Sequence, residues 1–228
     1  MQIGKAFTYT FEDVKWFSKL LIGALISIVP ILNIAWGGYT CEIIRRVSRQ
    51  DPEPLAGWDD LGTKFMQGLV LVIAGFIYAL PIIILSLFMI PLFIGAASTE
   101  GDVANMLATA GTGVGILLGC VISLYVLALT VFMPAVQINY ARKATFGSCF
   151  EIGAIIRLAT SNLGNYLLAW LAYLVFAMLA GLVGGGIASI LGLIPCIGWI
   201  FAILITAVIT PLIGVVYAHL FGQVAAVA

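Results

Sequence analysis

The sequence has few charged residues. Of its 228 residues, ten are basic, ten are acidic and one is histidine, so charged residues make up 9%, against about 25% in a soluble domain. Because 63% of the residues are hydrophobic, a soluble fold could not cover its apolar surface, and an integral membrane protein is predicted. The balanced charge leaves no basic patch for nucleic acid, which is excluded as a partner.

Metal-binding and catalytic motifs are also missing. The sequence contains no CxxC pair and no Cys/His cluster, so neither a metal site nor a disulfide framework is expected. A Walker loop, a GxSxG elbow and an HExxH pair are absent as well. We therefore predict a protein without catalytic residues, metal or cofactor. The isolated cysteines are Cys41, Cys120, Cys149 and Cys196.

The longest break in the apolar sequence is the segment 45–65, which reads as a membrane-surface loop. Before it, Thr10 and Asp13 have capping-box spacing, so a helix is expected to start near residue 11 and run to Val29. Pro30 and Asn33 then allow two interpretations. Either one kinked helix runs over 20–44, or the chain turns back as a second, shorter span.

The positions of the cations favour the turn, because short loops rich in Lys and Arg stay in the cytoplasm. Two spans around Pro30, followed by spans over 66–95, 106–139, 162–191 and 198–221, place all ten cations on one face. The sequence thus predicts an all-α integral membrane bundle of about six transmembrane helices with interfacial amphipathic segments. It would be a multi-pass plasma-membrane protein, with both termini cytoplasmic and the lipid bilayer as its first partner.

Small residues recur at four-residue spacing within two of these spans. Such stripes let helices approach closely in lipid, where packing drives association. They indicate packing within the bundle or a seam between two copies of the chain. The predicted packing residues are Gly111, Gly115, Gly119, Gly181 and Gly185. The run Gly184–Gly186 either breaks the fifth span, as in interrupted transporter helices, or is a point of tight packing, which is the favoured interpretation.

The segment 146–161 is expected to lie in the membrane interface, because Ile152, Ile155, Ile156 and Ala159 share one helical face. The whole chain, 1–228, reads as a single transmembrane domain. Within it, 31–95 and 106–191 share an order of inward helix, basic pair, aromatic-acidic segment and outward helix. This order indicates either a parallel repeat or similar interfacial chemistry in unrelated segments.

Glu42 is the only carboxylate within an apolar run, which makes it a functional candidate. Arg45 and Arg46 follow three and four residues later on the same helical face. Glu42 therefore forms a structural ion pair or an ion or proton site. The single histidine, His219, is expected at the interface.

The loop holds the densest group of carboxylates, including Asp59 and Asp60 beside Trp58. Without an EF-hand spacing, a solvated loop anchored by the tryptophan at the headgroups is favoured over metal binding. Polar residues near the spans are expected to hydrogen-bond between helices or to line a cavity. These are Asn33, Gln137 and Asn139.

The N-terminal quarter resembles a known family. The segments are FTYTFED at 7–13 with Trp16 and Lys19, IVPILN at 28–33, Gly38-Tyr39, Arg45, PEPL at 52–55 and WDD at 58–60. Over residues 5–65 the chain is similar to the prokaryotic membrane family named domain of unknown function 4013. The resemblance implies a polytopic membrane protein and brings no reaction and no functional residue.

Three functions remain open. The first is a non-catalytic membrane scaffold or assembly partner, bound to another copy or to other membrane proteins. The alternative is a small-solute or ion transporter or channel that uses Glu42 and the glycine-broken fifth helix. An enzyme acting on lipid would depend on Asp59 and Asp60.

Overall fold

The computed structural model describes residues 1–98, 101–194 and 198–228, and these form helices and irregular segments with no strand among them. The predicted all-α fold is confirmed. In chain order the elements are α1 (Ile3–Glu12), α2 (Trp16–Ile28), η1 (Leu32–Ile34), α3 (Ala35–Ser48), α4 (Leu61–Ser98), α5 (Asp102–Lys143), η2 (Phe146–Phe150), α6 (Ile152–Ser161), α7 (Leu163–Gly192) and α8 (Gly198–Val227).

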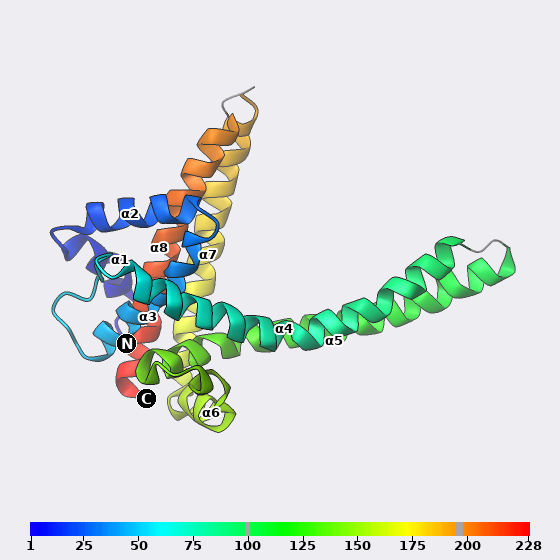
Figure 1. Cartoon of the computed structure of the whole chain (residues 1–228), viewed down its shortest axis with the longest axis horizontal. Helices are drawn as coiled ribbons and strands as arrows, with labels where there is room; N and C mark the ends of the chain where they lie inside the picture. The colour runs from blue at the N-terminus through cyan, green and yellow to red at the C-terminus, as the bar shows by residue number, and fades with distance from the viewer. Residues whose placement is uncertain (99–100, 195–197) are drawn as a thin grey trace. The chain divides into compact units, whose positions relative to one another are not determined.

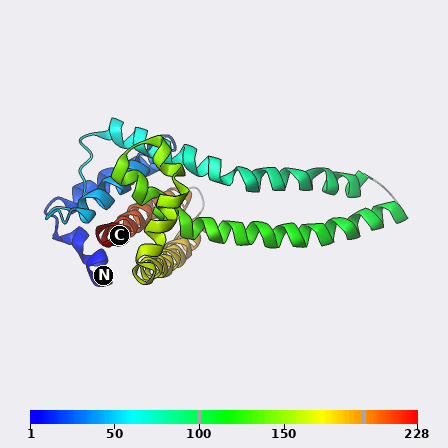
Figure 2. The same cartoon turned by 90° about the horizontal axis from the view of Figure 1, so that it is seen from below.

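The chain divides into two compact units, a main unit of residues 1–72 and 134–228 and a hairpin unit of residues 73–133. In the main unit, α1, α2 and α3 gather around α8, and α7 runs beside α8 (Figure 1). The N- and C-terminal segments adjoin each other (Figure 2), since the Gln223 amide exchanges hydrogen bonds of 2.7 and 3.0 Å with the Gln2 backbone.

The core of the main unit is concentrated at one end of α8. Most residues of α8 from Val215 to Ala225 are buried, as are nine of the fourteen residues of α3. The two helices run in the same direction, since Gly214 adjoins Trp36 and Gly222 adjoins Val47. The remainder of α7 and α8 exposes large aliphatic side chains, as expected for surface that faces lipid.

The hairpin unit consists of the C-terminal part of α4 and the N-terminal part of α5, which run side by side (Figure 2). The Tyr125 hydroxyl donates to the Tyr78 carbonyl at 3.0 Å, and the Tyr78 ring meets Phe132 edge-on. Most of its described side chains are exposed and apolar. A two-helix unit with this surface is consistent with lipid as its surroundings.

Four helices in the described part of the chain are long and apolar enough to cross a membrane: α4, α5, α7 and α8. The predicted spans over 66–95, 106–139, 162–191 and 198–221 correspond to them. The other two predicted spans correspond to shorter helices, since α2 has 13 residues and α3 has 14, or about 20 Å each at 1.5 Å per residue. The single kinked helix over 20–44 is wrong, since α2 ends before Pro30.

Two local predictions also need correction. The capping box is not formed: α1 starts at Ile3 and ends at Glu12, and Asp13 follows its C-terminus. The glycine run does not break the fifth span, since α7 continues through Gly184 to Gly192. The alternative of tight packing is confirmed at Gly184, where an added Cβ would collide with the side chain of Ile209 on α8. The sequence also predicts a turn over 193–199 between the last two spans, and this turn falls partly outside the described residues. A helix tolerates glycines in its interior when the neighbouring turns keep their hydrogen bonds.

The predicted interfacial segment is confirmed as helical. It forms η2 and the amphipathic helix α6. Ile155 is buried, whereas Ile152 and Ile156 remain exposed and Leu158 takes the second buried position. The helix therefore packs on the protein through one edge of its apolar face and leaves the other edge uncovered by the described residues.

Candidate functional site

The candidate site is the base of the main unit, where the loop 49–60 folds back between α2, α3 and α4. The loop starts at a sharp helix end. Gln50 adopts a left-handed conformation (φ 57°), the Asp51 N–H donates to the Arg46 carbonyl and the Gln50 N–H to the Val47 carbonyl. This Schellman arrangement satisfies the last carbonyls of α3 and directs the chain back toward α2.

A buried aromatic cluster holds the far end of the loop. Trp58 stacks on Tyr39 with ring centroids 4.3 Å apart, and Trp36 meets both rings edge-on. The Tyr39 hydroxyl donates to the Ala56 carbonyl at 3.1 Å, and Trp58 Nε1 donates to the Lys19 carbonyl at 2.8 Å. Burial raises the pKa of Tyr39 well above its ordinary value, which keeps the hydroxyl a donor. Trp58 is thus a packing residue.

Helix α2 ties the loop from the other side. Lys19 Nζ lies 2.6 Å from Asp13 Oδ2 and donates to the Leu55 carbonyl at 2.8 Å. Burial raises the pKa of Asp13, but hydrogen bonds from Lys19 and from the Lys15 backbone outweigh it, so the pKa lies below the ordinary 3.8. Leu55 itself is fully buried. The loop is therefore fixed at both its backbone and its side chains.

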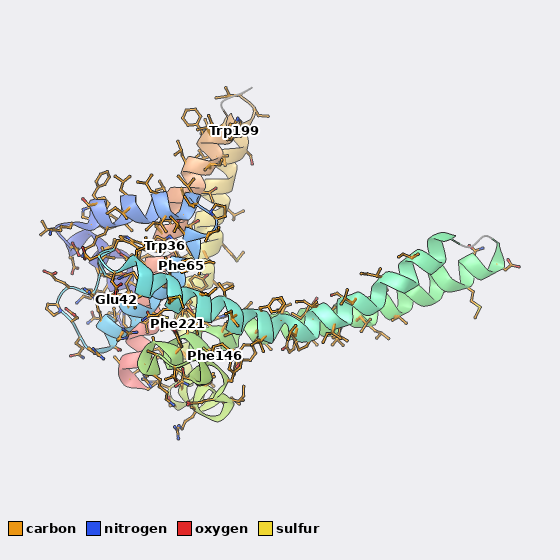
Figure 3. All side chains as sticks on the ribbon, in the orientation of Figure 1. Trp36, Glu42, Phe65, Phe146, Trp199 and Phe221 are labelled. Atoms are coloured by element: carbon orange, nitrogen blue, oxygen red, sulfur yellow. The ribbon has the colours of Figure 1, made fainter. Side chains whose placement is uncertain are left out.

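Glu42 lies between two cations on one side of this cluster. Its Oε1 is 2.5 Å from Arg46 Nη2, and its Oε2 is 2.7 Å from Lys64 Nζ at the start of α4. Lys64 is only 5% exposed, and the Glu42 carboxylate is the partner of its ammonium group. The predicted ion pair with Arg46 is confirmed, and Lys64 is a partner that the spacing within one helix could not reveal. Figure 3 shows Trp36 and Glu42 along α3.

Backbone packing brings Lys64 to Glu42. A Cβ added to Gly38 would lie 2.0 Å from the Lys64 carbonyl oxygen, and one added to Gly68 would lie 1.8 Å from the Ile34 carbonyl oxygen. Helices α3 and α4 therefore touch through glycine, a device that in membranes permits close approach. The sequence prediction placed such contacts elsewhere.

A surface cavity of about 730 Å³ opens beside the ion pairs. Its charged lining balances four basic side chains against four carboxylates, namely Arg45, Arg46, Arg49, Lys64, Glu42, Asp51, Glu53 and Asp60. The described residues contain no group of three or more His, Cys, Asp or Glu able to hold a metal ion.

Asp59 and Asp60 are exposed on this loop. Asp60 Oδ1 accepts from the Thr63 N–H at 3.2 Å, which caps the start of α4. Hydrogen bonding from Thr63 holds the pKa of Asp60 below its ordinary value. One of the two predicted carboxylates therefore has a structural function.

The sequence signature of a family described as a protein of unknown function (DUF4013) matches residues 21–192. The chain belongs to this family. The match extends from within α2 to the end of α7, so it includes the aromatic cluster and the Glu42 ion pairs. It confirms the resemblance drawn from the N-terminal residues. None of the curated proteins or solved structures that were compared matches the chain significantly.

Arginines connect the ends of three helices in this family member. Arg45 Nε on α3 donates to the Ala141 carbonyl on α5 at 2.9 Å, and Arg142 Nη2 on α5 donates to the Ala225 carbonyl on α8 at 2.5 Å. Helix C-termini carry partial negative charge, which these cations stabilise. Arg45 is therefore bound to a carbonyl, not to Glu42. Arg45 and Arg142 each belong to the basic pair of one copy of the predicted repeat. The repeat itself stays a prediction.

A polar chain joins α3, α5 and α8. The Tyr217 hydroxyl donates to Gln137 Oε1 at 2.7 Å, and Gln137 Nε2 donates to Thr40 Oγ1 at 2.7 Å. Asn139 donates to the Ser148 carbonyl at 2.8 Å and to Glu151 at 3.1 Å. The predicted hydrogen bonding between elements is confirmed for both amides.

Neighbouring Cys41 is buried, and burial raises the pKa of its thiol to about 12. The single histidine also packs inside the main unit: His219 is buried, stacks on Tyr9 and contacts Gln223. Its buried position differs from the interfacial one expected.

The predicted packing glycines lie in different surroundings. No described atom lies within 4 Å of a Cβ added to Gly119, Gly181 or Gly185, so these three are not points of close approach among the described residues. Gly111 is buried and Gly115 half-buried in the hairpin unit. A contact with a second copy stays a prediction for the stripe.

Proposed function

We propose that this protein is a non-catalytic scaffold of the plasma membrane, with both termini cytoplasmic, that binds another membrane protein or a second copy of itself through the base of the main unit. The observation that carries the proposal is the fixed loop 49–60. Its backbone and aromatic side chains are held by α2 and α3, while Glu53 and Asp59 remain exposed. A preformed surface loses little conformational entropy on binding.

The ion pairs support this function. Glu42 on α3 forms ion pairs with Arg46 on the same helix and with Lys64 on α4. The pair with Lys64 therefore joins α3 to α4. Because the loop connects these helices, the pairs fix its two ends. The proposed partner-binding surface is therefore maintained by buried charge and aromatic packing.

The test is purification of the tagged protein in mild detergent and in lipid nanodiscs, with mass photometry of the eluted particles. A stable stoichiometric partner or homo-oligomer is expected. Trp58→Ala, which releases the loop, should remove the partner. Trp199→Ala, on an exposed tryptophan near the other end of α8 (Figure 3), should retain it. A monomer in every condition would contradict the proposal.

A small-solute or ion transporter is the second candidate, and one observation favours it. The hydrogen-bonded chain of Thr40, Gln137 and Tyr217 links three helices, and polar groups within a bundle are typical of transport pathways. Liposomes that contain the protein should then release trapped ions or small solutes, and Gln137→Leu should slow this release. Liposomes that stay tight, with or without the substitution, would argue against transport.

A further inference from the structure

A cavity of about 490 Å³ lies between the two ends of the chain, within the main unit. Its walls come from α1, from the end of α3 and the start of the loop 49–60, from the first turn of α7 and from the last turns of α8. The two termini that meet there are seen close together in Figure 2. The cavity is separate from the one beside Glu42.

The single histidine of the chain lines this cavity from α8. His219 is 4% exposed, and its Nδ1 atom lies 3.0 Å from Nε2 of Gln223. Gln223 Oε1 accepts from the Gln2 N–H, so the NH₂ group of this amide is the part that faces the ring. Because an amide NH₂ only donates, Nδ1 is the acceptor, and the ring is neutral with its proton on Nε2.

The Nε2–H group of His219 is directed at free space. The bond to Gln223 is the one hydrogen bond of the ring in the described part of the chain. Every fully buried side-chain nitrogen or oxygen among the described residues has a partner, so Nε2 is open, and the cavity is the space that His219 lines. A donor on a buried ring that faces a cavity is a point at which a ligand oxygen can bind.

Two opposite charges lie on the face of α1 that lines the cavity. Lys5, Tyr9 and Glu12 follow one another at helical spacing, and all three belong to the lining. Lys5 and Glu12 are about 10 Å apart along the helix axis at 1.5 Å per residue. Neither forms an ion pair with another described residue. Lys5 is near enough to His219 for its charge to act on the ring, so the cation and the Nε2–H donor lie together.

A second carboxylate faces the cavity from the loop. Asp51 Oδ1 accepts from the Glu53 N–H at 3.0 Å, which leaves Oδ2 without a partner among the described residues. The lining therefore offers donors at Lys5 and His219 and acceptors at Glu12 and Asp51. A simple anion would meet two carboxylates, and a simple cation would meet the Lys5 ammonium. A ligand that carries both charges is complementary to this lining.

The position of the cavity indicates which zwitterion is present there. It lies at the start of α7 and the end of α8, both of which are candidate membrane spans. Lipid headgroups, with their phosphate and ammonium groups, surround the ends of such spans. A primary ammonium donates hydrogen bonds to carboxylates, whereas a quaternary ammonium is bound by a cage of aromatic rings. Tyr9 is the only tyrosine, tryptophan or phenylalanine in the described lining, so a primary ammonium fits better.

We propose that this cavity binds a phosphoethanolamine group, either as the headgroup of a phospholipid or as the free zwitterion. Lys5 and the His219 Nε2–H bind the phosphate, and Glu12 and Asp51 bind the ammonium. Because α1 and α8 both line the cavity, the ligand joins the two ends of the chain. The site is independent of whether the loop 49–60 binds a protein partner.

The first experiment measures lipid selectivity. The full-length protein in detergent is titrated with phosphatidylethanolamine, phosphatidylcholine and phosphatidylglycerol of identical acyl chains, and bound lipids are counted by native mass spectrometry. One phosphatidylethanolamine per chain is expected, with an affinity about tenfold higher than that of the other two lipids, which is the effect of one lost hydrogen bond to a charged group. Equal affinities for the three lipids would overturn the proposal.

Substitutions then assign the site. Lys5→Gln and Glu12→Gln change exposed side chains, and each should weaken the binding of phosphatidylethanolamine about tenfold. Glu12→Gln should also remove the preference over phosphatidylglycerol. Arg157→Gln and Glu53→Gln are the matched controls, because both side chains are exposed and lie outside the cavity lining. Unchanged affinity in the first pair, or an equal loss in the control pair, would contradict the assignment.

The second experiment observes His219 directly by magnetic resonance. Since the chain has one histidine, isotopic labelling of histidine, with a purification tag that contains none, gives the spectrum of a single ring. Nε2 should carry the proton and should transfer magnetisation to lipid phosphorus in nanodiscs that contain phosphatidylethanolamine. A proton on Nδ1, or no transfer, would refute the site. In detergent, a shift of the Nε2 signal with free phosphoethanolamine would identify the soluble zwitterion as a ligand, and a shift with the lipid alone would identify the headgroup.

Discussion

Gly38→Ala tests whether α3 and α4 touch through their backbones. The added Cβ would lie 2.0 Å from the Lys64 carbonyl oxygen and 2.6 Å from the Lys64 carbonyl carbon and Cα. These are backbone atoms, so no side chain can rotate away. Real Cβ contacts essentially never fall below 3.0 Å, so the helices must separate by about 1 Å, an overpacking that costs about 1–3 kcal/mol.

The separation should also lengthen the contact between Lys64 Nζ and Glu42, now 2.7 Å. At roughly 2–4 °C per kcal/mol for a chain of this size, a loss of about 2 kcal/mol lowers the melting temperature by about 4–8 °C. The assay is thermal unfolding in detergent, followed by tryptophan fluorescence of the aromatic cluster.

Gly62→Ala is the matched control on α4. No atom lies within 4 Å of its added Cβ, so alanine should stabilise the helix by up to about 1 kcal/mol. Gly68→Ala, with its Cβ 1.8 Å from the Ile34 carbonyl oxygen, should behave like Gly38→Ala. If Gly38→Ala melted at or above the temperature of the unsubstituted protein, the close backbone contact between α3 and α4 would be refuted.

Three further predictions concern the same base. Glu42→Gln should lower stability by about 2–3 kcal/mol because it leaves Lys64 buried without its carboxylate; adding Lys64→Met should recover part of the loss in chemical unfolding, and strictly additive effects would contradict the coupling. The folded pKa of Asp13 is depressed, so its stabilisation is complete above the unfolded pKa and is lost as pH falls through the folded pKa, below about pH 4. Asp13→Asn should remove that component from the melting profile between pH 3 and 7, and an unchanged profile would count against the Lys19 pair. Trp58→Ala should cost about 3 kcal/mol and make the loop 49–60 cleavable by protease in the native protein, whereas a loop as resistant as before would show that Trp58 does not hold it.

The apolar runs alone located the four long helices. Their ends fall within a few residues of the predicted spans, except where helices continue past the membrane, as α5 does through Asn139 to Lys143. An 18-residue apolar stretch has few alternatives to a spanning helix. The Glu42–Arg46 pair was equally predictable, because a spacing of four residues fixes neighbours on one helix.

The partners of Glu42 and Trp58 from distant segments were not predictable in this way. Lys64 reaches Glu42 only because Gly38 lets α4 approach, and Trp58 reaches Tyr39 only after the loop folds back. The sequence correctly predicted that helices approach each other closely at glycines, but it predicted this at the wrong glycines. The spacing of residues within one helix does not show which face of that helix meets a neighbour. Asp13 likewise had the spacing of a cap, but its carboxylate was bound by Lys19.

The amino-acid sequence by itself determined that the chain is helical, that it belongs in a membrane and where its four long apolar helices run. Only the tertiary structure decided which faces of α2 and α3 are buried and that both helices pack against α8. The physical reason is that a lipid bilayer and a protein interior are both apolar solvents. The residues of α3 that bury themselves against α8 are of the same kinds as those that face lipid, so hydrophobicity identifies the need for burial and not the surface that satisfies it.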